Sequence, residues 1–259
     1  MGTKLRSVTY LARCLAALSL LLGAWGCEDP PKKNPFDPPA DKPVEPPPAK
    51  EPPKPEGPPD LAIDTISPKV GFERENFQFP DGRKKLAAAL GQNQRFLEGK
   101  QATLIVDRKA KQDWVSAYLS ELGKIGVPSV LVKTETRDEF PHELVFTPES
   151  KLGSSAGCST VAMILEDRGT AVWKLSGGVA GKRGKGMAGP DLSMTGDTIE
   201  RVAKACKGAA ALFVVGAPEI EWGLVYDLAA STKKLNVHYD AVGLLSITPV
   251  PGHKVELAR

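Results

Sequence analysis

Apolar residues come in short runs separated by amphipathic segments over the part of the chain that follows residue 60. The run ATLIVDR at 102–108 is rich in apolar and β-branched residues, which predicts a buried strand. In the next segment, apolar side chains recur at spacings of four, four and three residues, which predicts a helix with one apolar face: Trp114, Tyr118, Leu122 and Ile125. The run PSVLVKTET at 128–136 predicts a further strand.

The same order of elements returns 108 residues later. The run AALFVVGAP at 210–218 predicts a second buried strand, and Trp222 and Tyr226 stand 108 positions after Trp114 and Tyr118. A Trp and a Tyr on one helix face are most simply explained by packing. Their recurrence nevertheless predicts an internal duplication.

The predicted fold class is α+β: two similar strand-helix-strand-helix-strand units, each a small mixed sheet with helices on one face. The first repeat is assigned to 61–150 and the second to 151–259. A helix is expected before the central strand of each repeat, at 81–99 and at 197–208. The second repeat is expected to close with strands at its end, the last one finishing at Thr248.

Residues 1–26 have the features of a secretory signal peptide. Basic side chains precede an apolar stretch between Leu15 and Trp25, which is too short to cross a bilayer because a spanning helix needs about 20 residues. The letters LLLGAWGC resemble a bacterial lipobox, so Cys27 is expected to be diacylated and to become the mature N-terminus. The alternative is ordinary cleavage after Gly26, which leaves Cys27 free.

Residues 27–60 are expected to form a lipid-anchored, Pro-rich linker. More than half of the 23 prolines lie between Pro30 and Pro59, among charged residues, and Phe36 is almost the only large apolar side chain. Such a segment buries too little apolar surface to offset its ordering entropy, so a disordered and extended tether is predicted. At about 3.1 Å per residue its reach is on the order of 100 Å.

The charge of the chain does not indicate a nucleic-acid partner. The formal net charge is +3, from 34 basic and 31 acidic residues. Lys4, Arg6 and Arg13 lie in the signal peptide, which has no acidic residue, so its removal leaves 31 basic against 31 acidic residues. A near-neutral mature protein lacks the electrostatic footprint that nucleic-acid binding requires.

The order LIVDRKAKQDWVSAYLSELGKIGVPSVLVKT resembles the periplasmic domain of the ExbD/TolR biopolymer-transport proteins. In that family a strand ending in an acidic residue leads into a helix, a glycine turn and another strand. Asp107 matches the strand-end aspartate, whereas Val215 stands there in the second repeat. The resemblance implies a domain that works as a dimer in the cell envelope, so that two repeats would form a pseudo-dimer within one chain. The family's proton-coupling transmembrane helix is not expected here.

Two motifs that suggest catalysis are incomplete. The segment GSSAG at 153–157 has the G-x-S-x-G pattern around Ser155, but no strand pattern precedes it and no helix pattern follows it. The Gly-rich, basic segment 176–189 lacks the Ser or Thr that a phosphate-binding loop needs after its Lys, since Gly186 follows Lys185. These segments are interpreted as connections, with a contact to an anionic envelope polymer as the alternative for the second.

No catalytic residue, metal site or cofactor is predicted. His142, His238 and His253 lie far apart and show no metal-binding spacing. The remaining cysteines of the mature chain, Cys158 and Cys206, are expected to form a disulfide because export brings them into an oxidising compartment. The alternative is two separately buried thiols.

The favoured function is that of a non-catalytic lipoprotein, exported, membrane-anchored and facing the periplasm, whose tandem domains bind an envelope protein or peptidoglycan. The alternative is a periplasmic enzyme, a hydrolase, whose site no motif reveals. The first repeat has the charged segment DRKAKQD where the second has VGAPEIE, so the candidate binding residues are Asp107, Arg108 and Lys109. Arg108 and Lys109 are expected to be exposed, and an alternative role for Asp107 is to cap the next helix.

Overall fold

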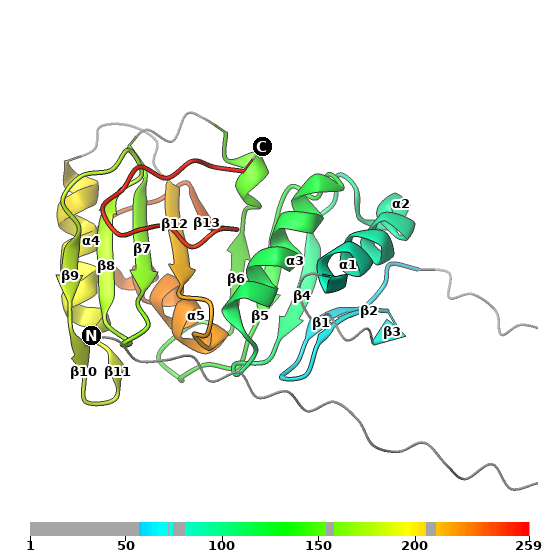
Figure 1. Cartoon of the computed structure of the whole chain (residues 1–259), viewed down its shortest axis with the longest axis horizontal. Coiled ribbons are helices and arrows are strands. Elements are labelled where there is room, and N and C mark those ends of the chain that lie inside the picture. The colour runs from blue at the N-terminus through cyan, green and yellow to red at the C-terminus, as the bar shows by residue number, and fades with distance from the viewer. Residues whose placement is uncertain (1–56, 72, 75–80, 154–157, 206–210, 259) are drawn as a thin grey trace, which may run out of the picture. The chain divides into compact units, whose positions relative to one another are not determined.

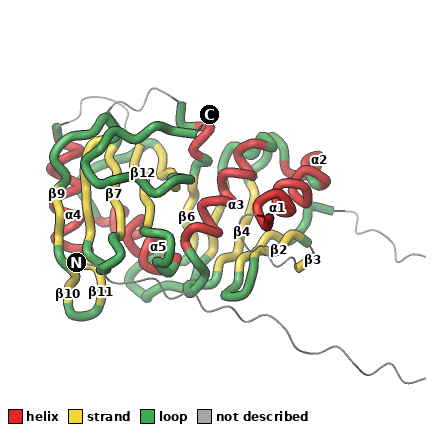
Figure 2. Tube along the Cα trace, in the orientation of Figure 1, coloured by secondary structure: helices red, strands yellow, loops and turns green. Residues whose placement is uncertain are grey.

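The computed structural model describes residues 57–258 except 72, 75–80, 154–157 and 206–210 (Figure 1). The described residues all belong to one compact unit, Lys54–Arg259. The other unit, Met1–Pro53, includes the expected signal peptide and is not among the described residues. The described part is α+β and contains two mixed sheets with helices between their strands (Figure 2).

The first sheet has six strands in the order β3-β2-β1-β4-β5-β6. Strand β4 lies between β1 and β5 and is parallel to both, whereas β2 and β6 run antiparallel to their neighbours. Helices α1 and α2 precede β4, and α3 follows it. The bounds are β1 Leu61–Ile63, β2 Pro68–Val70, β3 Glu73–Arg74, α1 Asp81–Gln92, α2 Gln94–Leu97, β4 Ala102–Val106, α3 Gln112–Lys124, β5 Val130–Lys133 and β6 Glu143–Phe146.

The second sheet has five strands in the order β13-β12-β7-β8-β9. Strand β12 lies between β7 and β13 and is parallel to both, and β8 runs antiparallel to β7 and β9. The bounds are η1 Glu149–Lys151, β7 Thr160–Ile164, β8 Thr170–Lys174, β9 Gly181–Arg183, β10 Lys185–Gly186, β11 Gly189–Pro190, α4 Leu192–Lys204, β12 Ala211–Gly216, α5 Trp222–Ser231, η2 Thr232–Lys234 and β13 Ala241–Leu244. Among the described residues, strands β10 and β11 pair only with each other.

The order of elements around the central strand is the same in the two sheets. Three consecutive strands, β1 to β3 or β7 to β9, form antiparallel pairs at one side, and a helix then leads to β4 or β12. After the central strand, α3 leads on to β5 and α5 leads on to β13, and each of these strands pairs in parallel on the other side. Ile105 on β4 and Phe213 on β12 therefore occupy corresponding positions, 108 residues apart.

Two helices differ from the expected bounds. Helix α4 begins at Leu192, earlier than expected, because the Asp191 side chain accepts a hydrogen bond from the backbone N–H of Met194 at 3.0 Å and caps the helix there. The helix expected at 81–99 is divided into α1 and α2 at Asn93, whose backbone N–H donates to the carbonyl of Leu90 at 3.0 Å.

The end of the second sheet also differs. The strand expected at 235–241 begins only at Ala241, and the expectation of a further strand that ends at Thr248 is wrong. The chain leaves the sheet after Leu244, and residues 245–258 form no strand. Proline explains part of this change, since Pro249 and Pro251 have no backbone N–H to donate to a sheet ladder.

The two sheets share one hydrophobic core. The loops that join β4 to α3 and β12 to α5 pair with each other: the N–H of Gln112 donates to the carbonyl of Ile220 at 3.0 Å, and that of Trp222 to Ala110 at 2.8 Å. Trp222 is fully buried, and its Nε1 donates to Thr134 Oγ1 at 2.8 Å. The Trp of the second Trp-Tyr pair thus packs between the two halves, as expected for a packing residue.

Candidate functional site

One face of the first sheet is exposed to solvent. Burial alternates along β4, where Thr103 and Ile105 are exposed and the residues on either side of each are buried. This alternation is typical of a sheet with one face on the core and the other in water. Ile105 is nevertheless 58 % exposed and Val145 on β6 is 46 % exposed, so two large apolar side chains lie on the open face.

The strand register places one residue from each of five neighbouring strands in a row across this face: Lys69, Ala62, Ile105, Lys133 and Glu143. All five line a depression of about 850 Å³, which we call the open depression. Ala62 and Ile105 form its apolar middle, and charged side chains stand on both sides of them.

The rim of the open depression is formed by loops at the ends of three parallel strands. Residues 64–65 follow β1, 107–109 follow β4, and 134–135 follow β5. Carboxyl ends of parallel strands lie at the same edge of a sheet, which is the usual place for a ligand in α/β sheets. The structure therefore brings the predicted binding residues, 107–109, to the rim of this depression.

Two ion pairs stand at the ends of the row. Lys69 Nζ lies 2.8 Å from Asp64 Oδ2, and Lys133 Nζ lies 2.7 Å from Glu143 Oε1. Partial burial raises the pKa of Asp64, but the hydrogen bonds from Lys69 and from two backbone N–H groups outweigh it and lower the pKa to about 2. Asp64 is therefore ionised at any physiological pH.

Asp107 and Lys109 form a tight turn on the rim. The backbone N–H of Lys109 donates to Asp107 Oδ1 at 2.7 Å. Asp107 does not cap the next helix, since the N-cap residue of α3 is Lys111, so that alternative is wrong. The side chain of Lys109 is exposed, as expected, and no ion pair of the described residues includes it.

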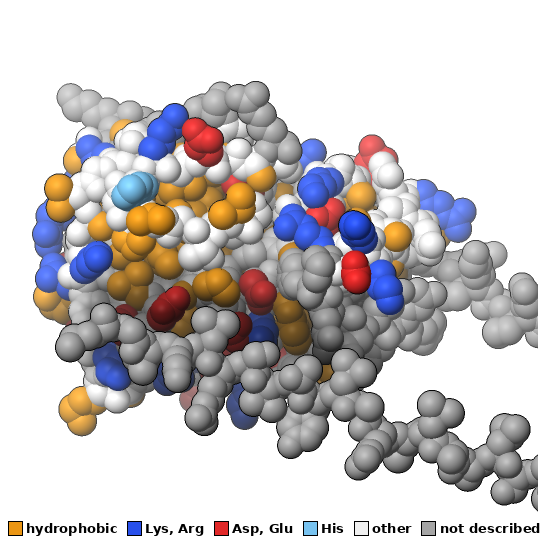
Figure 3. Space-filling model, in the orientation of Figure 1, with side chains coloured by type: hydrophobic (Ala, Val, Ile, Leu, Met, Phe, Trp, Pro, Cys, Tyr) orange, Lys and Arg blue, Asp and Glu red, His pale blue; other side chains and the backbone are white. Residues whose placement is uncertain are grey.

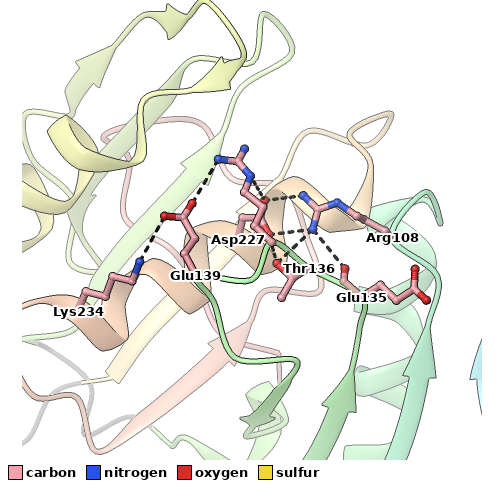
Figure 4. Close-up of polar contacts among 7 residues, drawn as sticks. Arg108, Glu135, Thr136, Glu139, Asp227 and Lys234 are labelled. Carbon is pink, nitrogen blue, oxygen red and sulfur yellow. Dashed lines mark hydrogen bonds and ion pairs between the residues drawn. The ribbon is translucent and has the colours of Figure 1, made fainter.

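Arg108 binds the second half of the molecule (Figure 4). Its Nη1 donates to Asp227 Oδ1 at 2.9 Å, and its Nη2 donates to Oδ2 of the same carboxylate, which is 1 % exposed. These hydrogen bonds raise the pKa of Arg108 because they stabilise its charged form. Arg108 is only partly exposed, which corrects the expectation that it is a free surface residue.

Further charged groups extend this contact along the loop after β5 (Figure 4). Arg137 Nε lies 3.6 Å from Asp227 Oδ2, and Arg137 Nη1 lies 3.7 Å from Glu139 Oε1. Glu139 Oε2 in turn lies 3.5 Å from Lys234 Nζ. The chain of contacts fastens the loop 134–140 to α5 and η2, and with it one wall of the open depression.

The corresponding face of the second sheet is covered. Every residue of β7 and β12 is buried, so these strands have no solvent face. The row that corresponds to the one described above consists of Trp173, Val161, Phe213 and Gly243. Trp173 and Phe213 are among the largest fully buried side chains.

Residues 245–258, which we call the C-terminal segment, provide this cover. In Figure 1 the segment passes in front of β7 and β8, and apolar side chains gather on that face of the molecule (Figure 3). Trp173 Nε1 donates to the carbonyl of His253 at 2.9 Å, and the N–H of Val255 donates to Leu175 at 3.0 Å.

One carboxylate holds both ends of the C-terminal segment. Glu149 Oε2 accepts a hydrogen bond from the N–H of Ser246 at 2.8 Å, and Oε1 accepts one from the N–H of Ala258 at 2.6 Å. Glu149 is 5 % exposed, and these two N–H groups provide hydrogen bonds to both of its buried carboxyl oxygens. The cover of the second sheet is therefore a fixed part of the fold.

The other predicted site residues are dispersed. Cys158 precedes β7, and next to it Ser159 Oγ accepts a hydrogen bond from the N–H of Ala211 at 3.0 Å. Cys27, Ser155 and Cys206 lie outside the described residues, so lipidation and the Cys158 to Cys206 disulfide stay predictions.

The histidines do not come together. His142 lines the open depression, His238 lines a separate pocket of about 350 Å³ beside β13, and His253 belongs to the C-terminal segment. In the described part of the chain, no group of three or more His, Cys, Asp or Glu side chains is placed to hold a metal ion. The Gly-rich segment 176–189 contributes β9, β10 and the first residue of β11.

No protein-family model, curated protein or solved structure matches this chain. Within the described residues, every helix is too short or too polar to cross a membrane. The resemblance to ExbD/TolR domains therefore stays a prediction from the sequence.

Proposed function

We propose that the chain is a non-catalytic cell-envelope lipoprotein, exported and anchored through Cys27, that binds an envelope protein through the open depression of its first sheet. In this proposal the Pro-rich segment 27–60 is the tether. The two sheets are ExbD/TolR-like repeats at 61–150 and 151–259, and they form a pseudo-dimer within one chain. Peptidoglycan is the alternative ligand of the same face.

The observation that carries this proposal is the exposure of Ile105 at the centre of the open depression. Exposed apolar surface rimmed by polar groups marks a binding site more often than scattered apolar side chains do, and Ile105 forms such a surface with Ala62 inside a rim of charged side chains. The charged groups nearby favour binding over catalysis, because Lys69 pairs with Asp64 and Lys133 with Glu143. An enzyme site needs polar groups that converge on a substrate instead.

The shared order of strands and helices supports the duplication. Corresponding loops pair with each other, and Lys111 Nζ lies 3.0 Å from Oε2 of Glu219, which follows it by one repeat length of 108 residues. Contacts between corresponding residues are what a two-fold arrangement of repeats produces. The resemblance of the first repeat to a family whose domains dimerise leads to the same interpretation.

The test is retention of envelope components on the immobilised mature chain and on its Ile105→Glu variant. We expect the variant to retain at least tenfold less of the partner than the wild type does, because a carboxylate replaces the apolar centre of the depression. Val250→Glu is the matched control, since Val250 is 61 % exposed and belongs to the C-terminal segment.

Equal retention by the wild type and the Ile105→Glu variant would remove the open depression as the binding face. Turnover of a hydrolase substrate by the purified chain, lost in the same variant, would favour the enzyme alternative. Mass spectrometry of the mature N-terminus tests the anchor separately, and an unmodified Cys27 would contradict it.

A further inference from the structure

The second sheet shows how an extended chain covers a face of this kind. The C-terminal segment starts near β12, where Thr248 Oγ1 donates to the carbonyl of Gly216 at 3.4 Å. It reaches the end of β8, where the N–H of Gly178 donates to Gly252 at 2.8 Å and that of Val255 to Leu175 at 3.0 Å. The segment therefore passes across β7, which lies between β12 and β8.

The open face of the first sheet corresponds to this covered face. Ile105 lies between Ala62 and Lys133 in the strand register, as Phe213 lies between Val161 and Gly243. Both central residues point away from the helices, yet Ile105 is 58 % exposed and Phe213 is fully buried.

We propose that the open depression binds an extended polypeptide segment of a partner protein, which crosses β1, β4 and β5 as the C-terminal segment crosses the second sheet. This inference rests on the proposed function and specifies its ligand. The row from Lys69 to Glu143 spans five strands, or about 19 Å at about 4.8 Å per strand spacing. About six residues of extended chain, at about 3.3 Å each, would fill it.

The lining predicts the chemistry of that segment. An apolar side chain fits over Ala62 and Ile105, which form the middle of the depression. Lys109 on the rim is exposed and takes part in none of the ion pairs of the described residues, so it favours an acidic side chain on the part of the segment nearest β4. Lys69 and Lys133 already pair with carboxylates of this chain, so they favour an acidic side chain on the bound segment less than Lys109 does.

The experiment places a photoreactive amino acid at Ala62 or at Lys133 of the full chain, in cells that make it. These positions flank Ile105 and are about 10 Å apart, because two strand spacings separate them. We expect both to cross-link to one segment of one protein, at sites about three residues apart. A synthetic peptide covering that segment should bind the purified chain, at least tenfold more weakly in Ile105→Glu but unchanged in Val250→Glu.

Three other results would overturn the inference. Cross-link sites that lie far apart in the partner's sequence would mean that a folded surface binds, and adducts that lysozyme releases would identify peptidoglycan; both leave a binding function in place. Cross-links at neither position, with the folded chain intact, would remove the binding function as well.

Discussion

Ile105 and Phe213 occupy corresponding positions on two sheets that share the order of five strands, yet Ile105 is exposed and Phe213 is buried. Lys69, Ala62 and Lys133 accompany Ile105, and this row is stable in water because long charged side chains flank the apolar middle. Trp173, Val161 and Gly243 accompany Phe213, and such a row requires cover.

The comparison shows that strand order alone does not decide whether a sheet face is available for binding. The second sheet uses residues 245–258 of its own chain to bury its apolar row. The first sheet keeps a corresponding face open and places the loop 107–109 at its edge. In the proposed function, the first half therefore binds the partner and the second half supports it.

The largest expected difference between the two sheets is in the free energy of unfolding. Phe213→Ala should lower it by about 3–5 kcal/mol, because a large buried side chain is lost and a cavity remains. Ile105→Ala at the corresponding exposed position should change it by no more than about 0.5 kcal/mol. Urea denaturation followed by circular dichroism measures both, and similar losses would mean that the first sheet is also covered in solution.

Breaking the contact between the two halves should lower the free energy of unfolding almost as much. Arg108→Ala removes the bidentate partner of the buried Asp227 carboxylate and should lower stability by about 2–3 kcal/mol, since Arg137 still lies 3.6 Å from that group. Lys109→Ala is the matched control next to it, with an expected change within about 0.5 kcal/mol. Thermal unfolding of the two variants checks this, and an unaffected Arg108 variant would show that the ion pair does not join the halves.

The cover of the second sheet should loosen without Glu149. Glu149→Ala leaves the N–H groups of Ser246 and Ala258 without their acceptor, at a cost of about 2 kcal/mol. Hydrogen exchange at Val255 should then become faster, because its N–H is protected by the bond to Leu175. A variant in which Val255 exchanges as slowly as in the wild type would show that other contacts hold the segment.

Local patterns in the sequence predicted the elements near both central strands. The apolar runs at 102–108 and 210–218 became β4 and β12, and the spacing of Trp114 and Tyr118 indicated α3. The C-terminal segment could not be predicted, because its position depends on distant contacts with Trp173 and Glu149.

The site was predicted only in part. The charge contrast between the two predicted repeats pointed to residues 107–109, which do line the open depression. It could not show that Arg108 binds Asp227, 119 residues later. The row through Ile105 could not be predicted, because it depends on the register between neighbouring strands. The alternation of exposed Thr103 and Ile105 with buried neighbours became visible only in the structure.

The smallest expected effect concerns the ion pair at the end of the open row, where Lys69 stands at the position of the buried Trp173. The pKa of Asp64 is lowered to about 2 in the folded chain from its usual 3.8, so the carboxylate stabilises the fold above about pH 4. That contribution is lost as the pH falls from about 4 to about 2, when the folded state must take up the proton. It should stay below about 1 kcal/mol, because the pair is accessible to solvent and screened. Asp64→Asn should flatten the pH dependence of unfolding in this range, whereas an unchanged profile would mean that Lys69 and Asp64 do not pair in solution.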